Sequence, residues 1–188
     1  LEAIYWKPRI EWVIRAIHVI NRIQFQNIRR NEVSYKGDKP FEIEDHRTQR
    51  TSMVLKDVRY VIDAEFKLLT DEEIIAKGFD LSDCTEEQLK ADFNEGKHLS
   101  CFNRKADAGK CFKQPVFGCR EFPAFFKLLK GEADIPPSFY ANVESQDLGW
   151  MVWDLNFDNK EKFTPRLFRA IMEKGRITTD PSKVEVKG

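Results

Sequence analysis

The sequence of 188 residues has little cysteine, only three histidines and no net charge. Its four cysteines form no CxxC pair, and the cysteine and histidine spacing is not that of a zinc site. We therefore expect no bound metal ion and no other cofactor. A disulfide framework is also unexpected at this cysteine density, which is typical of a protein in a reducing cytoplasm.

The sequence also lacks an apolar run near 18 residues and a secretory signal peptide, so we expect no contact with a membrane. Internal repeats and low-complexity segments are absent as well. The 41% hydrophobic and 12% aromatic residues are sufficient for a folded core. The length fits one domain, or one domain with an appendage.

The neutral total charge conceals two segments of opposite sign. Residues 70–95 hold nine acidic and two basic residues, which gives a net charge of −7. Residues 96–130 hold eight basic and two acidic residues, which gives a net charge of +6. A basic segment inside a neutral protein favours a polyanion bound on one face.

Periodicity predicts several extended segments. Alternating or β-branched residues indicate strands at 10–20, 23–30, 58–68 and 149–157, with strand-like alternation also in 115–129. Residues 31–45, which contain Gly37 and Pro40, are expected to form a mobile loop.

Helix signals are fewer. Residues 1–6 resemble the end of a helix that Pro8 stops. In the acidic segment, Thr85 and Gln88 have the spacing of a capping box, and the helix that they begin is expected to weaken at Gly96.

A second helix is expected near the C-terminus. Residues 165–174 begin with a proline and are followed by Gly175, the usual order at the two ends of a helix. A moderately long helix between strands, with a β-rich remainder, predicts an α+β fold. The helix–strand–strand–helix–strand order is that of a split βαβ unit without its first strand.

Four motifs resemble a known family, and they occur in register along the chain: IYWKP at 4–8, NEGKH at 94–98, QPVFGCREF at 114–122 and GWMVWDLNF at 149–157. Together they resemble the type I-C CRISPR repeat-processing endoribonucleases, the d-type Cas five proteins of the RAMP superfamily. The resemblance implies a ferredoxin-like, RRM-related domain at residues 1–130 and a small β-rich part at 131–188. Family members begin with a strand and the start of a helix that precede the first motif here, so the first domain is expected to be incomplete.

The resemblance also implies an activity. The family cuts CRISPR precursor RNA on the 3′ side of the repeat hairpin without a metal ion and keeps the product in an effector complex. The implied partners are therefore CRISPR repeat RNA and the other subunits of a type I-C complex. The family's catalytic positions fall on Tyr5, Lys97 and His98.

These three residue types fit metal-free RNA cleavage. The RNA supplies its own nucleophile, the 2′-hydroxyl, and positioned acid–base groups typically contribute about 10²–10⁴-fold each. His98 can exchange a proton near neutral pH, Lys97 can face the phosphate, and Tyr5 can hydrogen-bond the 2′-hydroxyl. The expected products carry a 2′,3′-cyclic phosphate and a 5′-hydroxyl.

Basic side chains in two regions are candidates for RNA contact. One group lies at residues 29–50 and the other in the basic segment: Arg29, Arg30, Arg47, Arg50, Arg104, Lys105, Lys110 and Lys113. A-form stems are recognised by shape and phosphates, and affinity should fall steeply with salt.

Structural explanations compete with each assignment. A lysine–histidine pair is usually not catalytic, a tyrosine beside a tryptophan is usually packed, and exposed arginines usually only solubilise. His18, in an apolar strand, is expected to be structural. The whole protein also fits a second class, a scaffold that holds the 5′ handle of a mature guide RNA without cutting it.

Overall fold

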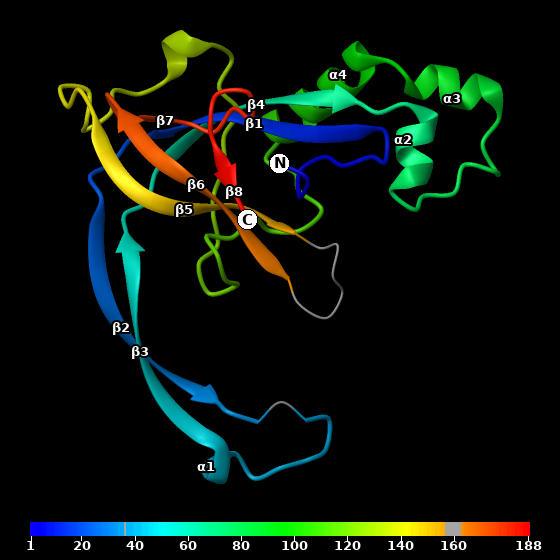
Figure 1. The fold of residues 1–188 in the computed structure, drawn as a ribbon. Coiled ribbons are helices and arrows are strands. Elements are labelled where there is room, and N and C mark those ends of the chain that lie inside the picture. The colour runs from blue at the N-terminus through cyan, green and yellow to red at the C-terminus, as the bar shows by residue number, and fades with distance from the viewer. Residues whose placement is uncertain (36, 157–162) are drawn as a thin grey trace.

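The fold is built on one antiparallel sheet, shown in Figure 1. The computed structural model describes residues 1–35, 37–156 and 163–188. Along the sheet the strands follow the order β4-β1-β7-β6-β5, and β8 pairs with β6 beside this path. Their bounds are Ile10–Val19 for β1, Tyr60–Leu68 for β4, Gln146–Asn156 for β5, Thr164–Glu173 for β6, Arg176–Thr178 for β7 and Val186–Lys187 for β8.

Three predicted strands are confirmed as β1, β4 and β5. β1 pairs with β4 from Ile10 opposite Leu68 to Val19 opposite Tyr60, with one irregularity after Ile14. Phe157, the last residue of the strand predicted at 149–157, lies outside the described residues.

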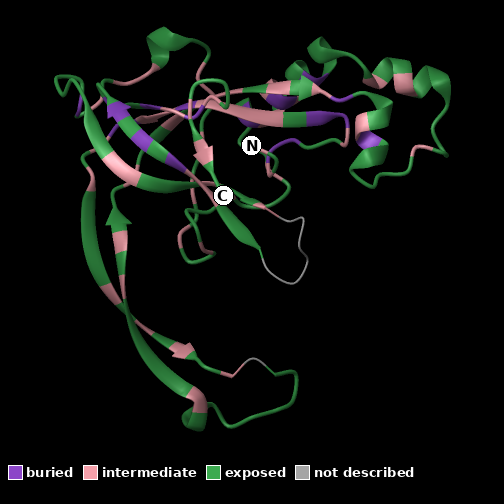
Figure 2. Cartoon of the chain, in the orientation of Figure 1, coloured by how far each residue is buried: buried purple, intermediate pink, exposed green. Residues whose placement is uncertain are grey.

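A long hairpin projects away from this sheet (Figure 1). It consists of β2, Gln24–Val33, and β3, Arg47–Lys56, which pair with each other along their whole length. The strand predicted at 23–30 is therefore confirmed and extends further, whereas β3 was not predicted. Residues 31–45 are not wholly loop, since they include the end of β2 and the start of the short helix α1, Ile43–His46. Most of the hairpin is exposed (Figure 2).

Three helices lie beside one end of the β1–β4 pair: α2, Asp71–Ala76, α3, Glu86–Asp92, and α4, Glu95–Asp107. The predicted capping box is confirmed, because the Gln88 N–H donates to Thr85 Oγ1 at 3.3 Å and the Thr85 N–H donates to Gln88 Oε1 at 2.9 Å. The predicted weakening at Gly96 is wrong. A new helix begins there, because Asn94 Oδ1 accepts the Lys97 N–H at 2.9 Å and caps α4.

Three other predictions fail locally. Residues 1–6 form a turn rather than a helix tail. The alternating segment 115–129 contains one isolated bridge, Val116 to Pro123, instead of a strand. The helix expected at 165–174 is the strand β6.

Sheet pairing explains the change from helix to strand in β6. A helix face is suggested by two pairs of apolar residues spaced four apart, Leu167 with Ile171 and Phe168 with Met172. The alternation of a strand is also present, at Phe168, Ala170 and Met172. These three alternating residues are the ones that are buried. Gly175 then belongs to the β6–β7 turn, where Lys174 has φ 50° and Gly175 has φ 86°. Positive φ at both central residues is typical of tight hairpins.

Two clusters of buried side chains form the core. One surrounds Phe168, Ala170 and Met172 of β6, and the other joins Tyr5 and Ile10 to α4. The antiparallel sheet with helices beside it confirms the α+β architecture predicted from the sequence. The boundary between 1–130 and 131–188 stays a prediction, although β7 from the second part pairs directly with β1 from the first.

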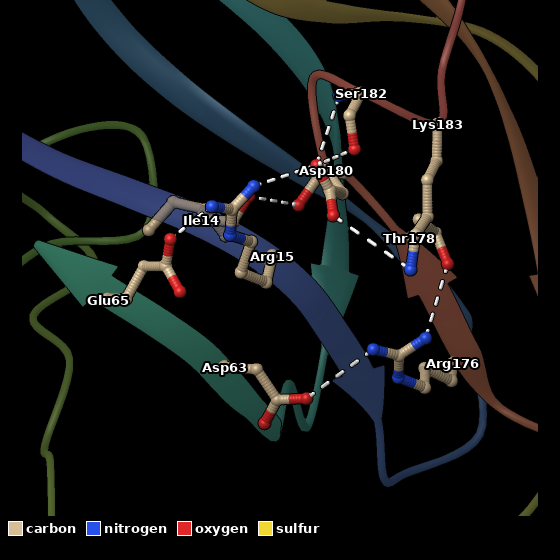
Figure 3. A network of polar contacts seen from close by, with 10 residues as sticks. Ile14, Arg15, Asp63, Glu65, Arg176, Thr178, Asp180, Ser182 and Lys183 are labelled. Atoms are coloured by element: carbon tan, nitrogen blue, oxygen red, sulfur yellow. Dashed lines mark hydrogen bonds and ion pairs between the residues drawn. The ribbon is translucent and has the colours of Figure 1, made fainter. Parts of the chain in front are cut away.

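Polar contacts also join these two parts, as Figure 3 shows. Arg15 of β1 bonds Asp180 Oδ1 at 2.7 Å on one side and Glu65 of β4 on the other. Arg176 of β7 lies 3.8 Å from Asp63 of β4. β7 and the segment after it are therefore held against β1 and β4. No helix in the described part of the chain is long and apolar enough to cross a membrane.

Candidate active site

Two of the three predicted catalytic residues are in direct contact. The Tyr5 hydroxyl lies 2.8 Å from His98 Nδ1, although 93 positions separate the residues in the sequence. Tyr5 comes from the turn before β1, and His98 comes from the first turn of α4. The structure thus brings together the IYWKP and NEGKH motifs.

Local contacts hold Tyr5 in place. Its N–H donates to the Leu1 carbonyl at 3.0 Å, and its own carbonyl accepts from Trp12 Nε1 at 3.1 Å. After Pro8, the buried Arg9 donates to the Leu69 carbonyl at 2.9 Å and pairs with Asp71 at 2.5 Å. These bonds fix the start of β1 and with it the turn that carries Tyr5.

The partners of His98 define its tautomer. His98 Nε2 lies 2.7 Å from the Asp92 carbonyl oxygen, which can only accept, so Nε2 carries a proton. In the neutral imidazole, Nδ1 is then an acceptor, and the Tyr5 hydroxyl donates to it. The result is a donor chain from Tyr5 through His98 to the Asp92 backbone.

Lys97 shares Asp92 with His98. Lys97 Nζ lies 3.1 Å from Asp92 Oδ1 and 3.2 Å from the Ala91 carbonyl oxygen. Asp92, at the end of α3, therefore positions Lys97 with its side chain and His98 with its backbone. Asp92 was not predicted from the sequence, where the available signal is an acidic residue five positions before Lys97.

The surroundings keep Tyr5 protonated. Burial raises the pKa of the Tyr5 phenol, and nearby Cys101 and Asp92 raise that pKa further. Lys105 Nζ lies 5.2 Å from the centre of the Tyr5 ring. The phenol is therefore a hydrogen-bond donor at neutral pH rather than a preformed phenolate.

The pair is enclosed. Tyr5 is 6% exposed and His98 is 0% exposed, whereas the Lys97 side chain is 47% exposed. Lys97 and His98 follow Gly96, where the helix was expected to weaken, but both lie in the capped first turn of α4. A ligand can touch His98 only if side chains around it move.

The eight predicted RNA-binding residues fall into two groups. Arg29, Arg30, Arg47 and Arg50 all lie on the β2–β3 hairpin. The others lie in the last turns of α4 and in the loop after it: Arg104, Lys105, Lys110 and Lys113.

Two of these eight residues already have acidic neighbours. Arg30 is 3.6 Å from Glu32 and 3.8 Å from Glu121, and Arg50 is 3.4 Å from Glu32. Within the described ranges, Arg29 and Arg47 have no ion-pair partner. Their assignment to RNA contact stays a prediction.

The remaining histidines have other neighbours. His18 Nε2 lies 2.8 Å from Asp63 Oδ2 between paired strands, as expected for a structural residue. His46 packs against Tyr35 and Phe41 at the end of the hairpin. In residues 1–35, 37–156 and 163–188, no three His, Cys, Asp or Glu side chains gather as metal ligands would.

Comparison with known proteins points to one family. The Cas5d model, described as CRISPR-associated protein (Cas_Cas5), matches residues 1–180. A relative from Mannheimia succiniciproducens, named CRISPR pre-crRNA endoribonuclease Cas5d, is 37% identical over 201 residues, covering 98% of this chain and 81% of the relative. A relative of the same name from Thermus thermophilus is 37% identical over 158 residues, covering 84% of this chain and 58% of the relative.

Solved structures share the fold. A functionally uncharacterised protein from Streptococcus mutans superposes with a TM-score of 0.63 at 24% identity, covering 100% of this chain and 80% of its own. A CRISPR-associated protein superposes with a TM-score of 0.65 at 22% identity, covering 100% of this chain and 79% of its own. At these identities the likeness concerns the fold alone.

Proposed function

Because the chain belongs to the Cas5d family of CRISPR-associated proteins, we propose that it is an endoribonuclease that cleaves CRISPR precursor RNA at the repeat hairpin. The observation that carries this proposal is the Tyr5–His98 hydrogen bond beside Lys97. Tyr5 of one motif meets His98 of a distant one there, next to Lys97, and each of the three is given a role in metal-independent cleavage. The product stays in a type I-C effector complex in the cytoplasm.

The reaction uses the RNA 2′-oxygen as nucleophile. This oxygen forms a bond to phosphorus, and the bond from phosphorus to the 5′-oxygen breaks. The 2′-hydroxyl proton passes to the Tyr5 oxygen while the Tyr5 proton passes to His98 Nδ1, which the observed hydrogen bond favours. The leaving 5′-oxygen takes a proton from solvent, and the His98 imidazolium later returns one.

Cations beside this pair stabilise the charge that develops on the phosphate. The Lys97 side chain is 47% exposed and is held by Asp92, so Lys97 is the candidate for the non-bridging oxygens. Lys105, above the Tyr5 ring, is the second candidate. The products are a 2′,3′-cyclic phosphate and a 5′-hydroxyl.

Burial of the pair favours a second candidate function. With His98 fully enclosed, the Tyr5–His98 bond can also serve only to hold α4 against β1. In that case the protein is a scaffold that binds the 5′ handle of a guide RNA through the arginines of its β2–β3 hairpin. Both candidates bind repeat RNA, and only the first produces a cyclic phosphate.

Cleavage of the repeat RNA in EDTA distinguishes the two. We expect one cut with a 2′,3′-cyclic phosphate end, slowed about 10²–10⁴-fold in His98→Ala because proton transfer is lost. Lys97→Ala should also slow the cut. The measurement is the single-turnover rate together with the chemistry of the product ends.

The control is Lys90→Ala, since Lys90 is an exposed lysine on the preceding helix. This variant should cut at the parent rate. Tight RNA binding with no cut, unchanged in all three variants, would reject the endoribonuclease and support the scaffold.

A further inference from the structure

A hollow lies at the base of the hairpin, away from the Tyr5–His98 pair. Its walls come from the β1–β2 connection, the β3–β4 connection and the segment 136–139, and its volume is about 580 Å³. The hollow is open to solvent rather than enclosed, so a ligand would be held at the surface. Tyr5 precedes the first residue of β1 and the hollow follows the last, so about 30 Å of strand separates them.

Hydrogen bonds between distant segments shape this hollow. The Phe139 N–H donates to the Ile20 carbonyl at 2.8 Å, and Ser138 Oγ donates to the Val19 carbonyl at 2.6 Å. The Ile23 N–H donates to the Tyr140 hydroxyl at 2.8 Å. The segment 136–140 is thus fastened to the β1–β2 connection before any ligand arrives.

Two arginines in the walls have no acidic partner. Among the residues that the structure describes, neither Arg22 nor Arg59 forms an ion pair, whereas six other arginines do. The one carboxylate in the walls, that of Asp57, lies 4.0 Å from Lys56. The hollow therefore carries positive charge that is not neutralised within the protein.

An exposed aromatic ring lies beside these arginines. Phe139 is 61% exposed, and the Arg22 guanidinium lies 5.8 Å from its ring centre. The hydrogen bond from its own N–H holds the backbone of this residue, so the ring is presented from a fixed position. Guanidinium groups bind phosphates, and exposed rings stack on bases.

We propose that this hollow binds one unpaired nucleotide of an RNA strand, with its phosphate between Arg22 and Arg59 and its base on Phe139. The inference rests on the proposed function for the kind of polymer, and it adds a second contact site. An unpaired nucleotide fits better than a stem, since its base is free to stack. Gln24 also lines the hollow, and its amide can both donate to and accept from a base edge.

Binding of a fluorescein-labelled oligouridylate, which has no repeat hairpin, tests the site. Anisotropy titrations at several salt concentrations compare the full chain with Arg22→Ala, Arg59→Ala and Phe139→Leu. Each arginine variant should lower the slope of log affinity against log salt by about 0.7, the value for one single-strand phosphate contact. Phe139→Leu should weaken binding about tenfold or more, and Phe139→Trp should retain it.

Lys90→Ala is again the matched control, because it removes an exposed positive charge far from the hollow in sequence. If the hollow variants and Lys90→Ala bind the oligouridylate equally well, the inference is overturned. A second measurement, photocrosslinking with 5-iodouridine in the same RNA, should label the peptide that contains Phe139; labelling only elsewhere also overturns it.

These outcomes are independent of the cleavage test. If the protein cuts repeat RNA and its hollow variants bind the oligouridylate normally, the proposed function stands and the second binding site is rejected. If the protein does not cut repeat RNA but its hollow variants no longer bind the oligouridylate, the second binding site stands and the endoribonuclease activity is rejected.

Discussion

At the residue scale, the proton positions around His98 follow from one backbone carbonyl. The Asp92 oxygen requires a proton on Nε2, so Nδ1 is left to accept from Tyr5. Substitution of Asp92 by asparagine would leave that carbonyl in place, but it would remove the carboxylate that holds Lys97 and that lies 3.9 Å from His98 Nε2. Asp92 therefore acts on His98 through both its backbone and its side chain.

Tyr5 should titrate above its ordinary pKa of 10.0, because burial disfavours the phenolate and Cys101 and Asp92 add to the effect. The folded state then holds this proton at pH values where the unfolded chain has lost it. Stability is unaffected below about pH 10 and falls as the pH rises through the folded pKa. Tyr5→Phe should lose less stability in this alkaline range.

The measurement is the ultraviolet absorbance of phenolate during a pH titration, taken as the difference between the parent and Tyr5→Phe. Urea unfolding at neutral and alkaline pH supplies the stability comparison. A difference titration centred at or below pH 10 would contradict the enclosed position of Tyr5.

At the scale of elements, the β6–β7 turn shows how a glycine signal has two meanings. Gly175 fits the end of a helix as well as a tight hairpin turn, and both uses need positive φ. The structure selects the turn because β6 pairs with β5 on one edge and with β7 and β8 on the other. Packing of Phe168 and Met172 then decides which face is buried.

Gly175→Ala should destabilise the protein by about 1–3 kcal/mol, the usual range for a non-glycine residue forced into such a conformation. Its φ is 86°, and an added Cβ would lie 2.1 Å from Ser138 Oγ and 2.6 Å from Ser138 Cβ. Ser138 cannot move freely, because it donates to the Val19 carbonyl. Urea unfolding measures the change.

Gly131→Ala is the matched control. Gly131 has an extended backbone, φ −175°, and nothing lies within 4 Å of an added Cβ. Equal stability losses for the two variants would show that the Gly175 turn is not held as described.

At the scale of the molecule, the two parts of the chain, 1–130 and 131–188, share one sheet because the three residues of β7 pair with β1. The contacts in Figure 3 strengthen that short connection, with Asp180 between Arg15 and Lys183. The same arrangement places the Tyr5–His98 pair at one end of β1 and the basic hollow at the other. A protein with no net charge thereby presents positive charge at two separate places.

Asp180 should make stability sensitive to acid. Hydrogen bonds from the Ser182 side chain and backbone, and the nearby Arg15 and Lys183, lower the pKa of Asp180 below its ordinary 3.8. The stabilisation is fully present above pH 3.8 and is lost as the pH falls through the folded pKa. Asp180→Asn should therefore be less stable at neutral pH and less sensitive to acid than the parent.

Thermal unfolding between neutral pH and pH 3 measures this dependence. Asp83→Asn, an exposed aspartate in the acidic segment, serves as the control and should follow the parent curve. If the unfolding temperatures of the parent and Asp180→Asn fall in parallel as the pH is lowered, the charge of Asp180 does not stabilise the contact between the two parts of the chain.

The sequence predicts the strands β1, β2, β4 and β5 and the Thr85 capping box without the structure, since local periodicity and capping decide these features. It also supplied Tyr5, Lys97 and His98, through motifs rather than through spacing. Three further features are visible only in the folded chain: 165–174 pairs as a strand, His98 is enclosed, and Asp92 holds Lys97. The physical reason in the first two cases is that partners from distant segments, absent from any local window, supply the hydrogen bonds and the burial. Asp92 is only five positions from Lys97, but the geometry between the end of α3 and the start of α4 places the two side chains in contact.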